Sequence, residues 1–145
     1  MQSLQINTGE ISLCVNDDAT RVISFNPTDI SFVERFYGLL SEFEEKEKEY
    51  KHKAEELQND TGVGAFDIPN NFGDALALLR ETCEFLRTKI DNVFGKGTSD
   101  AAFGNANTLD MFSQFFAGIT PFIQKAREKQ IDKYKAPSGR KNVLK

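Results

Sequence analysis

Hydrophobic and polar residues alternate through the first 25 positions of the chain. Ile11, Leu13 and Val15 are separated by polar or small side chains, and the run RVISF repeats this two-residue period, which is typical of a half-buried strand. The turn-forming sequence NDDA lies between the two runs, so a β-hairpin is predicted over residues 11–25. Together with the earlier run LQIN, residues 1–26 are expected to supply two or three strands, and these need a helix to pack against.

The period changes at the sequence NPTDIS, after which aromatic and aliphatic residues recur every seven positions. Seven residues are close to two helical turns, so these side chains form one stripe on a helix predicted over residues 28–57. Two starts are compatible with the sequence: Asn26 as the cap with Pro27 in the first turn, or Ser31 and Glu34 as a capping box. The second half of the helix is highly charged, which is typical of a solvated face, with a projecting coiled-coil arm as the alternative. The stripe consists of Phe36, Phe43, Tyr50 and Leu57.

A loop rich in Gly, Asn and Asp separates this helix from a second one, predicted over residues 71–94 with Asn71 as its cap. Its apolar residues follow steps of three and four without interruption, so the helix has a wide buried face. We expect this helix to lie at the centre of the core along its whole length. The stripe consists of Phe72, Leu76, Leu79, Cys83, Leu86, Ile90 and Val93.

A third helix is predicted over residues 108–135, and it carries a phenylalanine-rich band. Gly118 and Pro121 predict a kink within it, because proline cannot donate a hydrogen bond to the preceding turn. Residues 136–145 are expected to form a basic, flexible tail. The band divides into residues expected in the core, Phe112, Phe115 and Ile119, and residues expected to be exposed, Phe116 and Phe122.

The predicted fold is therefore α+β and predominantly helical, with an N-terminal β-hairpin packed on three main helices in a single domain, residues 1–135. A chain of 145 residues is typical of one domain and is long enough to bury a hydrophobic core. Its 13 phenylalanines, with no tryptophan, indicate either core packing or an apolar contact surface, because a phenylalanine ring has no polar group to satisfy.

The segment VFGKGTSDAAFG, residues 93–104, raises the question of a phosphate-binding loop. The P-loop pattern G-x-x-x-x-G-K-[ST] fails at both its first glycine and its final Ser or Thr, and the preceding segment is predicted to be a helix rather than a strand. We interpret the segment as a joint between helices. The second helix ends at Gly95, Thr98 or Ser99 caps a one-turn helix, and Gly104 closes that helix.

The charge is unevenly distributed along the chain. From Lys125 onward eight Lys or Arg residues accompany two acidic ones, a net charge of +6 within a total of −4. We interpret this basic end as solvated or paired with the acidic body, so no nucleic-acid partner is expected. No export signal and no bilayer-length apolar segment is seen, so we expect no membrane contact and a cytoplasmic location. Cys14 and Cys83 are accordingly expected to be reduced and buried.

Convergent catalytic or metal-binding groups are not evident in the sequence. His52 is the sole histidine and lies between two lysines, so neither a zinc site nor an imidazole-activated nucleophile has a set of partners. The carboxylates cluster in the charged helix, where solvation explains them. We therefore expect no enzyme activity, no metal and no cofactor.

Three segments resemble one family of small proteins from tailed phages and prophages of Firmicutes. They are FNPTDISFVERFYGLLSEFEEKEKEY, VFGKGTSDAAFG and MFSQFFAGITPFIQKAREKQIDKY, and the resemblance extends over roughly Ile23–Tyr134. Members of that family are regarded as tail components or tail assembly chaperones. The resemblance implies a chaperone that binds the long, aggregation-prone tape measure protein during tail assembly. The alternative is a structural tail or connector subunit that self-assembles through its charged helix.

A binding surface for such a partner is predicted beside the expected kink of the third helix. There an apolar patch, rimmed by Lys125 and Glu47, would accept an amphipathic helix of the tape measure protein. Self-association of the chain is also open. The predicted partner-binding residues are Phe116, Phe122, Tyr50 and Phe115.

Overall fold

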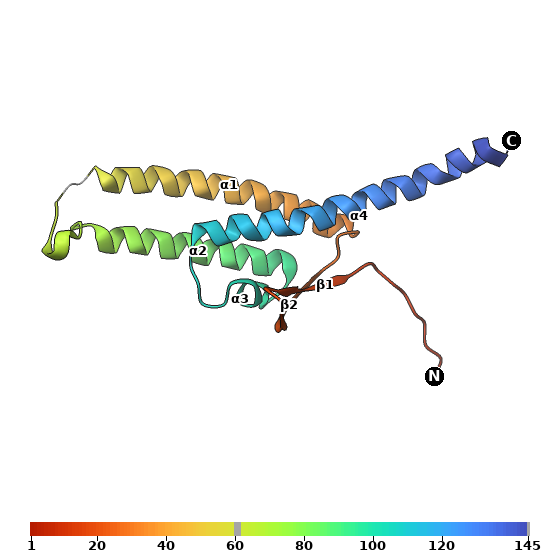
Figure 1. The fold of residues 1–145 in the computed structure, drawn as a ribbon, viewed down its shortest axis with the longest axis horizontal. Coiled ribbons are helices and arrows are strands. Elements are labelled where there is room, and N and C mark those ends of the chain that lie inside the picture. The colour runs from red at the N-terminus through yellow and green to blue at the C-terminus, as the bar shows by residue number, and fades with distance from the viewer. Residues whose placement is uncertain (60–61, 145) are drawn as a thin grey trace.

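A computed structural model describes residues 1–59 and 62–144 of the chain, with side chains up to residue 133. It has the predicted α+β, mostly helical architecture, in which a two-stranded antiparallel hairpin precedes the helices (Figure 1). In chain order the elements are β1 (Ile11–Val15), β2 (Asp18–Phe25), α1 (Ile30–Gln58), the short 3-10 helix η1 (Ala65–Asp67), α2 (Phe72–Phe94), α3 (Thr98–Phe103) and α4 (Leu109–Leu144).

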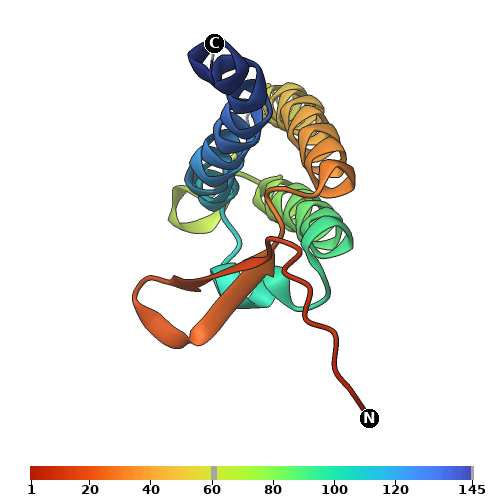
Figure 2. The same cartoon turned by 90° about the vertical axis from the view of Figure 1, so that its right-hand side faces the viewer.

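The helices α1 and α2 lie side by side and antiparallel, and they form the long body of the molecule (Figure 1). The hairpin and α3 pack at the end of this pair where α2 finishes (Figure 2). α4 begins part-way along the pair, runs back over the end that carries the sheet, and projects beyond it. The long helices α1, α2 and α4 therefore pack together at one end of the molecule, which we call the proximal end, whereas the other end, the distal end, holds α1 and α2 without α4.

The hairpin forms where the alternating pattern predicts it. Ile11 pairs with Phe25 and Leu13 with Ile23, so these apolar side chains share the inner face of the sheet. The two turn residues, Asn16 and Asp17, both have positive φ, as a tight turn between twisted strands requires. The predicted strand over LQIN is wrong, since residues 1–10 are not assigned to any strand.

α1 begins one residue after Asp29, whose side chain accepts a hydrogen bond of 3.0 Å from the backbone N–H of Ser31. Both predicted caps are therefore wrong. Asn26 does not cap the helix because its side-chain oxygen accepts from the backbone N–H of Thr28, while its amide group donates to the carbonyl of Thr8. The hydrogen bonds of Asn26 therefore hold the segment that precedes α1 in place and do not cap the helix.

The segment after α2 is a joint, as predicted. α2 ends at Phe94, Gly95 follows with φ of 122°, and α3 closes at Gly104 with φ of 57°. The predicted side-chain cap of α3 is wrong: Asp91 of α2 accepts hydrogen bonds from the backbone N–H of Ser99 at 2.8 Å and from its hydroxyl at 3.1 Å. This carboxylate near the start of α3 also complements the helix dipole.

The expectation that α2 is central along its whole length is wrong. Its buried residues begin at Thr82, and Phe72 and Leu76 in its first half are about half exposed. The stripe is continuous, but α4 covers only the part of α2 that lies at the proximal end. Cys83 lies in that part and burial raises the pKa of its thiol, which keeps it protonated and unreactive. Cys14, expected to be buried, is exposed on β1.

The expected division of the third helix into core and exposed phenylalanines is wrong at Phe116. Its side chain is 4% exposed and packs on Phe43 of α1 at a ring distance of 5.1 Å. Phe122 is 40% exposed, as predicted, and Phe112 and Ile119 are buried as predicted. Phe116 is buried because α4 packs on α1 at this position, where its ring also lies 6.2 Å from that of Phe36.

α4 starts next to Thr108, as predicted, and the Thr108 hydroxyl oxygen accepts from the backbone N–H of Met111. The helix continues through Pro121, which removes one backbone hydrogen bond without ending the helix. The predicted end at residue 135 is wrong, because the helical backbone extends to Leu144. The basic side chains of residues 136–145 lie outside the described side chains.

The difference in burial between Phe116 and Phe122 predicts a difference in stability on one helix. Phe116→Ala is expected to lower the free energy of unfolding by about 3–5 kcal/mol, because it leaves a cavity in the core. Phe122→Ala is expected to cost about 1 kcal/mol, because much of its ring is already in water. Urea unfolding followed by circular dichroism measures both. Equal losses would contradict the assignment of Phe116 to the core.

Candidate partner-binding groove

The distal end of α1 and α2 contributes little to the core. The buried residues of α1 end at Phe43, and those of α2 begin at Thr82. The remaining halves of both helices still carry apolar residues, which a solvated helix pair would not need. These residues therefore form a candidate contact surface.

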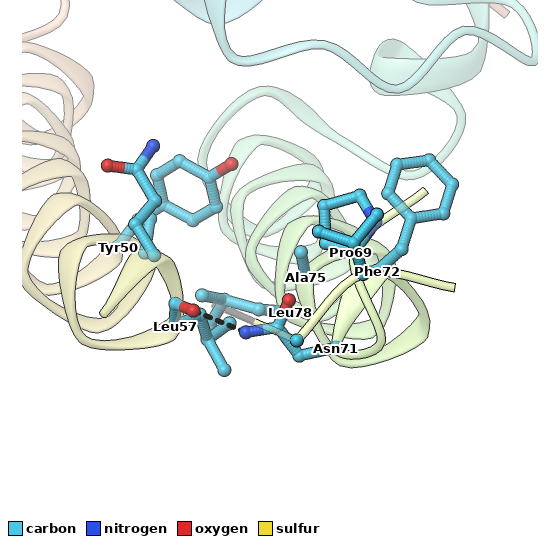
Figure 3. Close-up of a pocket in the computed structure, with 11 residues that line it drawn as sticks. Tyr50, Leu57, Pro69, Asn71, Phe72, Ala75 and Leu78 are labelled. Carbon is cyan, nitrogen blue, oxygen red and sulfur yellow. Dashed lines mark hydrogen bonds between the residues drawn. The ribbon is translucent and has the colours of Figure 1, made fainter. Parts of the chain in front are cut away.

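A hollow of about 460 Å³ lies between the two helices at this end. In Figure 3, Tyr50 and Leu57 of α1 and Ala75 and Leu78 of α2 point into the space between the helices, with Pro69 at its edge. Among the residues that the structure describes, its lining is apolar apart from the hydroxyl of Tyr50 and amide groups, and no charged side chain lines it. We call this hollow the distal groove. It is lined by Tyr50, Ala54, Leu57, Gln58, Gly62, Val63, Pro69, Asn71, Phe72, Ala75 and Leu78.

The α1 side of the distal groove continues the line that packs on α4 at the proximal end. Phe36 and Phe43 contact Phe116 of α4, at ring distances of 6.2 and 5.1 Å. Tyr50 and Leu57 are the next two positions at the same seven-residue spacing, so they face the same side of α1. α4 begins at Leu109, part-way along the helix pair, and none of its described residues lines the distal groove. The distal groove is thus the place where a third helix would continue the packing.

The loop between α1 and α2 closes the distal groove at its outer end. Val63 and Pro69 form an isolated β-bridge, and the amide group of Asn71 donates to the carbonyl of Leu57 (Figure 3). The loop also presents Phe66, which is 95% exposed and has φ of 60°, in the left-handed region that a phenylalanine rarely adopts. An exposed aromatic ring held in a strained backbone is a feature of functional loops rather than of packing.

Exposed apolar side chains surround the distal groove. Sequence reasoning missed those in the loop, because the loop was recognised by its Gly, Asn and Asp content alone. The signal that could have found them is the set of large apolar residues inside GVGAFDIP, which a solvated loop does not require. The exposed apolar residues here are Val63, Phe66, Ile68, Phe72 and Leu76.

The structure does not bring the four predicted site residues together. Tyr50 lines the distal groove, whereas Phe115 and Phe116 pack in the aromatic core of the proximal end. Phe122 lies in a separate hollow of about 340 Å³ beside Lys125 and the start of β1. The predicted groove between them is absent because α4 lies directly on α1 at the position of Phe116.

The charged residues of α1 pair with one another along the helix. The ammonium of Lys53 lies 2.9 Å from a carboxylate oxygen of Glu49 and, with Lys46, lowers the pKa of that carboxyl. His52 lies 3.0 Å from Glu56.

Among the described residues, no group of three His, Cys, Asp or Glu side chains could hold a metal ion. Within residues 1–59 and 62–144, no helix has both the length and the apolar character to cross a membrane.

A known family accounts for most of the chain. The model of DUF6673, a family of unknown function, matches residues 19–143. The chain belongs to DUF6673. Comparison with curated proteins and with solved structures gives no match. The DUF6673 match begins in β2 and includes both helices of the distal groove, so the groove is part of the family domain.

The exposed apolar lining predicts that this DUF6673 protein binds hydrophobic dyes at the distal end. We expect ANS to fluoresce with the native protein, and Phe72→Ser to lower the emission, because the substitution removes half-exposed apolar surface from the groove wall. Circular dichroism should be unchanged. Ser113→Ala, at an exposed position of α4, is the control and should leave the emission as it is. Unchanged emission in Phe72→Ser would show that the dye binds elsewhere.

Proposed function

We propose that this DUF6673 protein is a non-catalytic phage tail assembly chaperone that binds a helical segment of a tape measure protein in the distal groove. The observation that carries the proposal is the incomplete three-helix packing. Phe43 packs on α4, but Tyr50 and Leu57, which continue its line, are only partly buried beside α2, and no described residue of α4 lines the groove with them. A partner helix placed end to end with α4 would complete the arrangement.

The face of α4 that packs at the proximal end indicates what such a partner would look like. It presents Phe112, Phe116, Ile119 and Ile123, which follow helical steps of three and four and are almost fully buried. A partner with large apolar residues at the same spacing would bury its own apolar stripe together with the groove. No charged side chain of the described residues lines the groove, so binding relies on apolar burial and tolerates variation in the partner sequence.

The resemblance of three segments to phage tail assembly proteins supports the choice of partner. A tape measure protein is long, helical and rich in apolar stripes that have no place to pack before the tail tube surrounds it. A chaperone that covers such a stripe prevents aggregation without any chemical reaction. Its place of action would be the cytoplasm of the infected bacterium.

The proposal is tested by co-expressing the chain with a fragment of the tape measure protein that is insoluble alone. The wild-type chain is expected to bring the fragment into the soluble fraction and to co-purify with it. Tyr50→Asp and Phe72→Asp are each expected to reduce the co-purified fragment more than tenfold, because each places an unpaired charge against an apolar partner surface.

Ser41→Asp is the matched control, since it adds the same charge at an exposed position of α1 outside the groove. It should retain full binding, and circular dichroism should show that all three variants keep the wild-type helix content. Full binding by both groove variants would place the contact elsewhere. A wild-type chain with no effect on the fragment would overturn the proposed function.

Mass spectrometry of purified particles separates this function from that of a structural tail or connector subunit. A chaperone is expected to be absent from finished particles, while deletion of its gene removes the tails. A constant copy number in each particle would instead identify a structural subunit.

A further inference from the structure

The first residues of the chain are extended but pair with no strand of the described structure. Residues 1–10 leave the hairpin and run away from the helices (Figure 2). Leu4 and Ile6 alternate with polar residues and are 82% and 73% exposed. This is the pattern of a half-buried strand, displayed by a segment that buries neither face.

The hairpin has a free edge that could accept such a strand. Within the described part of the chain the sheet contains only β1 and β2, so the outer edge of β1 presents backbone N–H and C=O groups that no described strand pairs with. On the inner face, Ile23 and Phe25 of β2 are buried to 5% and 4% exposure, whereas Ile11 and Leu13 of β1 are only half-buried. On the inner face, the apolar side chains of β2 are therefore buried, whereas those of β1 remain partly exposed to solvent.

Two hollows lie at the two ends of β1, and both are walled by the strand and by α4. One, of about 340 Å³, has Ile11 on the strand side and Phe122 on the helix side. The other, of about 370 Å³, has Val15 on the strand side and Met111 on the helix side. A strand added along the edge of β1 would place its inward side chains over this line of hollows.

We infer that residues 1–8 of one copy of the chain add as a third strand to the free edge of β1 in a second copy. Leu4 and Ile6 then face inward beside Leu13 and Val15, which places Gln5 opposite Cys14, and main-chain hydrogen bonds complete the edge. Ser3, Gln5 and Asn7, which alternate with them, lie on the outer face of the sheet.

A chain cannot add this segment to its own sheet in the described conformation. The carbonyl of Thr8 accepts hydrogen bonds from the side chains of Asn26 at 2.6 Å and Thr28 at 3.1 Å. These contacts fix the chain just before β1 and direct residues 1–7 away from its edge (Figure 2). The occupant is therefore the segment of another copy.

The size of the contact indicates a reciprocal pair. A stable interface of standard size takes roughly 20–30 residues from each partner. When each copy adds its segment to the sheet of the other, each copy contributes residues 1–8 and the five residues of β1 to the interface. When only one copy adds its segment, the interface contains about half as many residues. The reciprocal arrangement comes closest to a stable interface, so we expect a closed dimer that dissociates on dilution.

Cys14 provides a direct test, because it is exposed and lies on the outer face of β1. Gln5 would lie on the outer face of the added strand, near Cys14 of the other copy. Gln5→Cys is therefore expected to form disulfide-linked dimers under mild oxidation, seen on a non-reducing gel. Ile6→Cys, on the inner face, is expected to form none, because its side chain points to the opposite side of the sheet.

Two controls make the result specific. Gln5→Cys combined with Cys14→Ser should give no dimer, which excludes linkage between the two introduced cysteines. Deletion of residues 1–8 should convert the dimer into a monomer in sedimentation velocity runs at all concentrations, with unchanged circular dichroism. An intramolecular disulfide, equal cross-linking from positions 5 and 6, no cross-linking from either, or unchanged sedimentation on deletion would each overturn the inference.

Discussion

The side chain of Phe94, at the end of α2, contacts aromatic residues of β2, α1 and α4 at one point. Its ring centre lies 5.6 Å from that of Phe25 in β2 and 5.1 Å from that of Phe32 in α1. It lies 5.1 Å from that of Phe115 in α4. Phe94 is also the last residue of α2, and the positive φ of Gly95 turns the chain away immediately after it. The sheet, the helix pair and α4 are therefore held in position by edge-on aromatic contacts around the end of one helix.

Two arginines hold the joint against this aromatic cluster. Arg21 of β2 donates to the carbonyls of Ala101 at 2.8 Å and Ala102 at 2.7 Å. Arg87 of α2 donates to the carbonyl of Gly104 at 2.9 Å. The last carbonyls of a short helix have no partners within the helix, and the guanidinium groups supply them. α3 is thereby fixed to the sheet and to α2, and its position sets where α4 can start.

The sequence period located the helices correctly because a stripe depends only on local geometry. It could not show which part of a stripe would be covered. The stripe of α2 is uninterrupted from Phe72 to Val93, yet only its second half is buried, because the joint brings α4 in part-way along the pair. The same limit explains Phe116 and Tyr50. Each lies on an apolar line, and only the placement of α4 puts Phe116 in the core and leaves Tyr50 at the distal groove.

The positions of the two contact surfaces have a consequence for binding. The distal groove lies at the loop between α1 and α2, and the free edge of β1 lies at the proximal end (Figure 1). If two copies pair through residues 1–8, both grooves therefore remain accessible. Two grooves on one dimer can hold two stretches of the same long helical protein, and the second binding event is then intramolecular. Linked sites of this kind raise the overall affinity by about 10²–10⁴ without any new contact, provided that both can be engaged at once. A weak apolar groove is then sufficient to retain a long partner, while each single contact remains weak enough to be released when the partner is assembled.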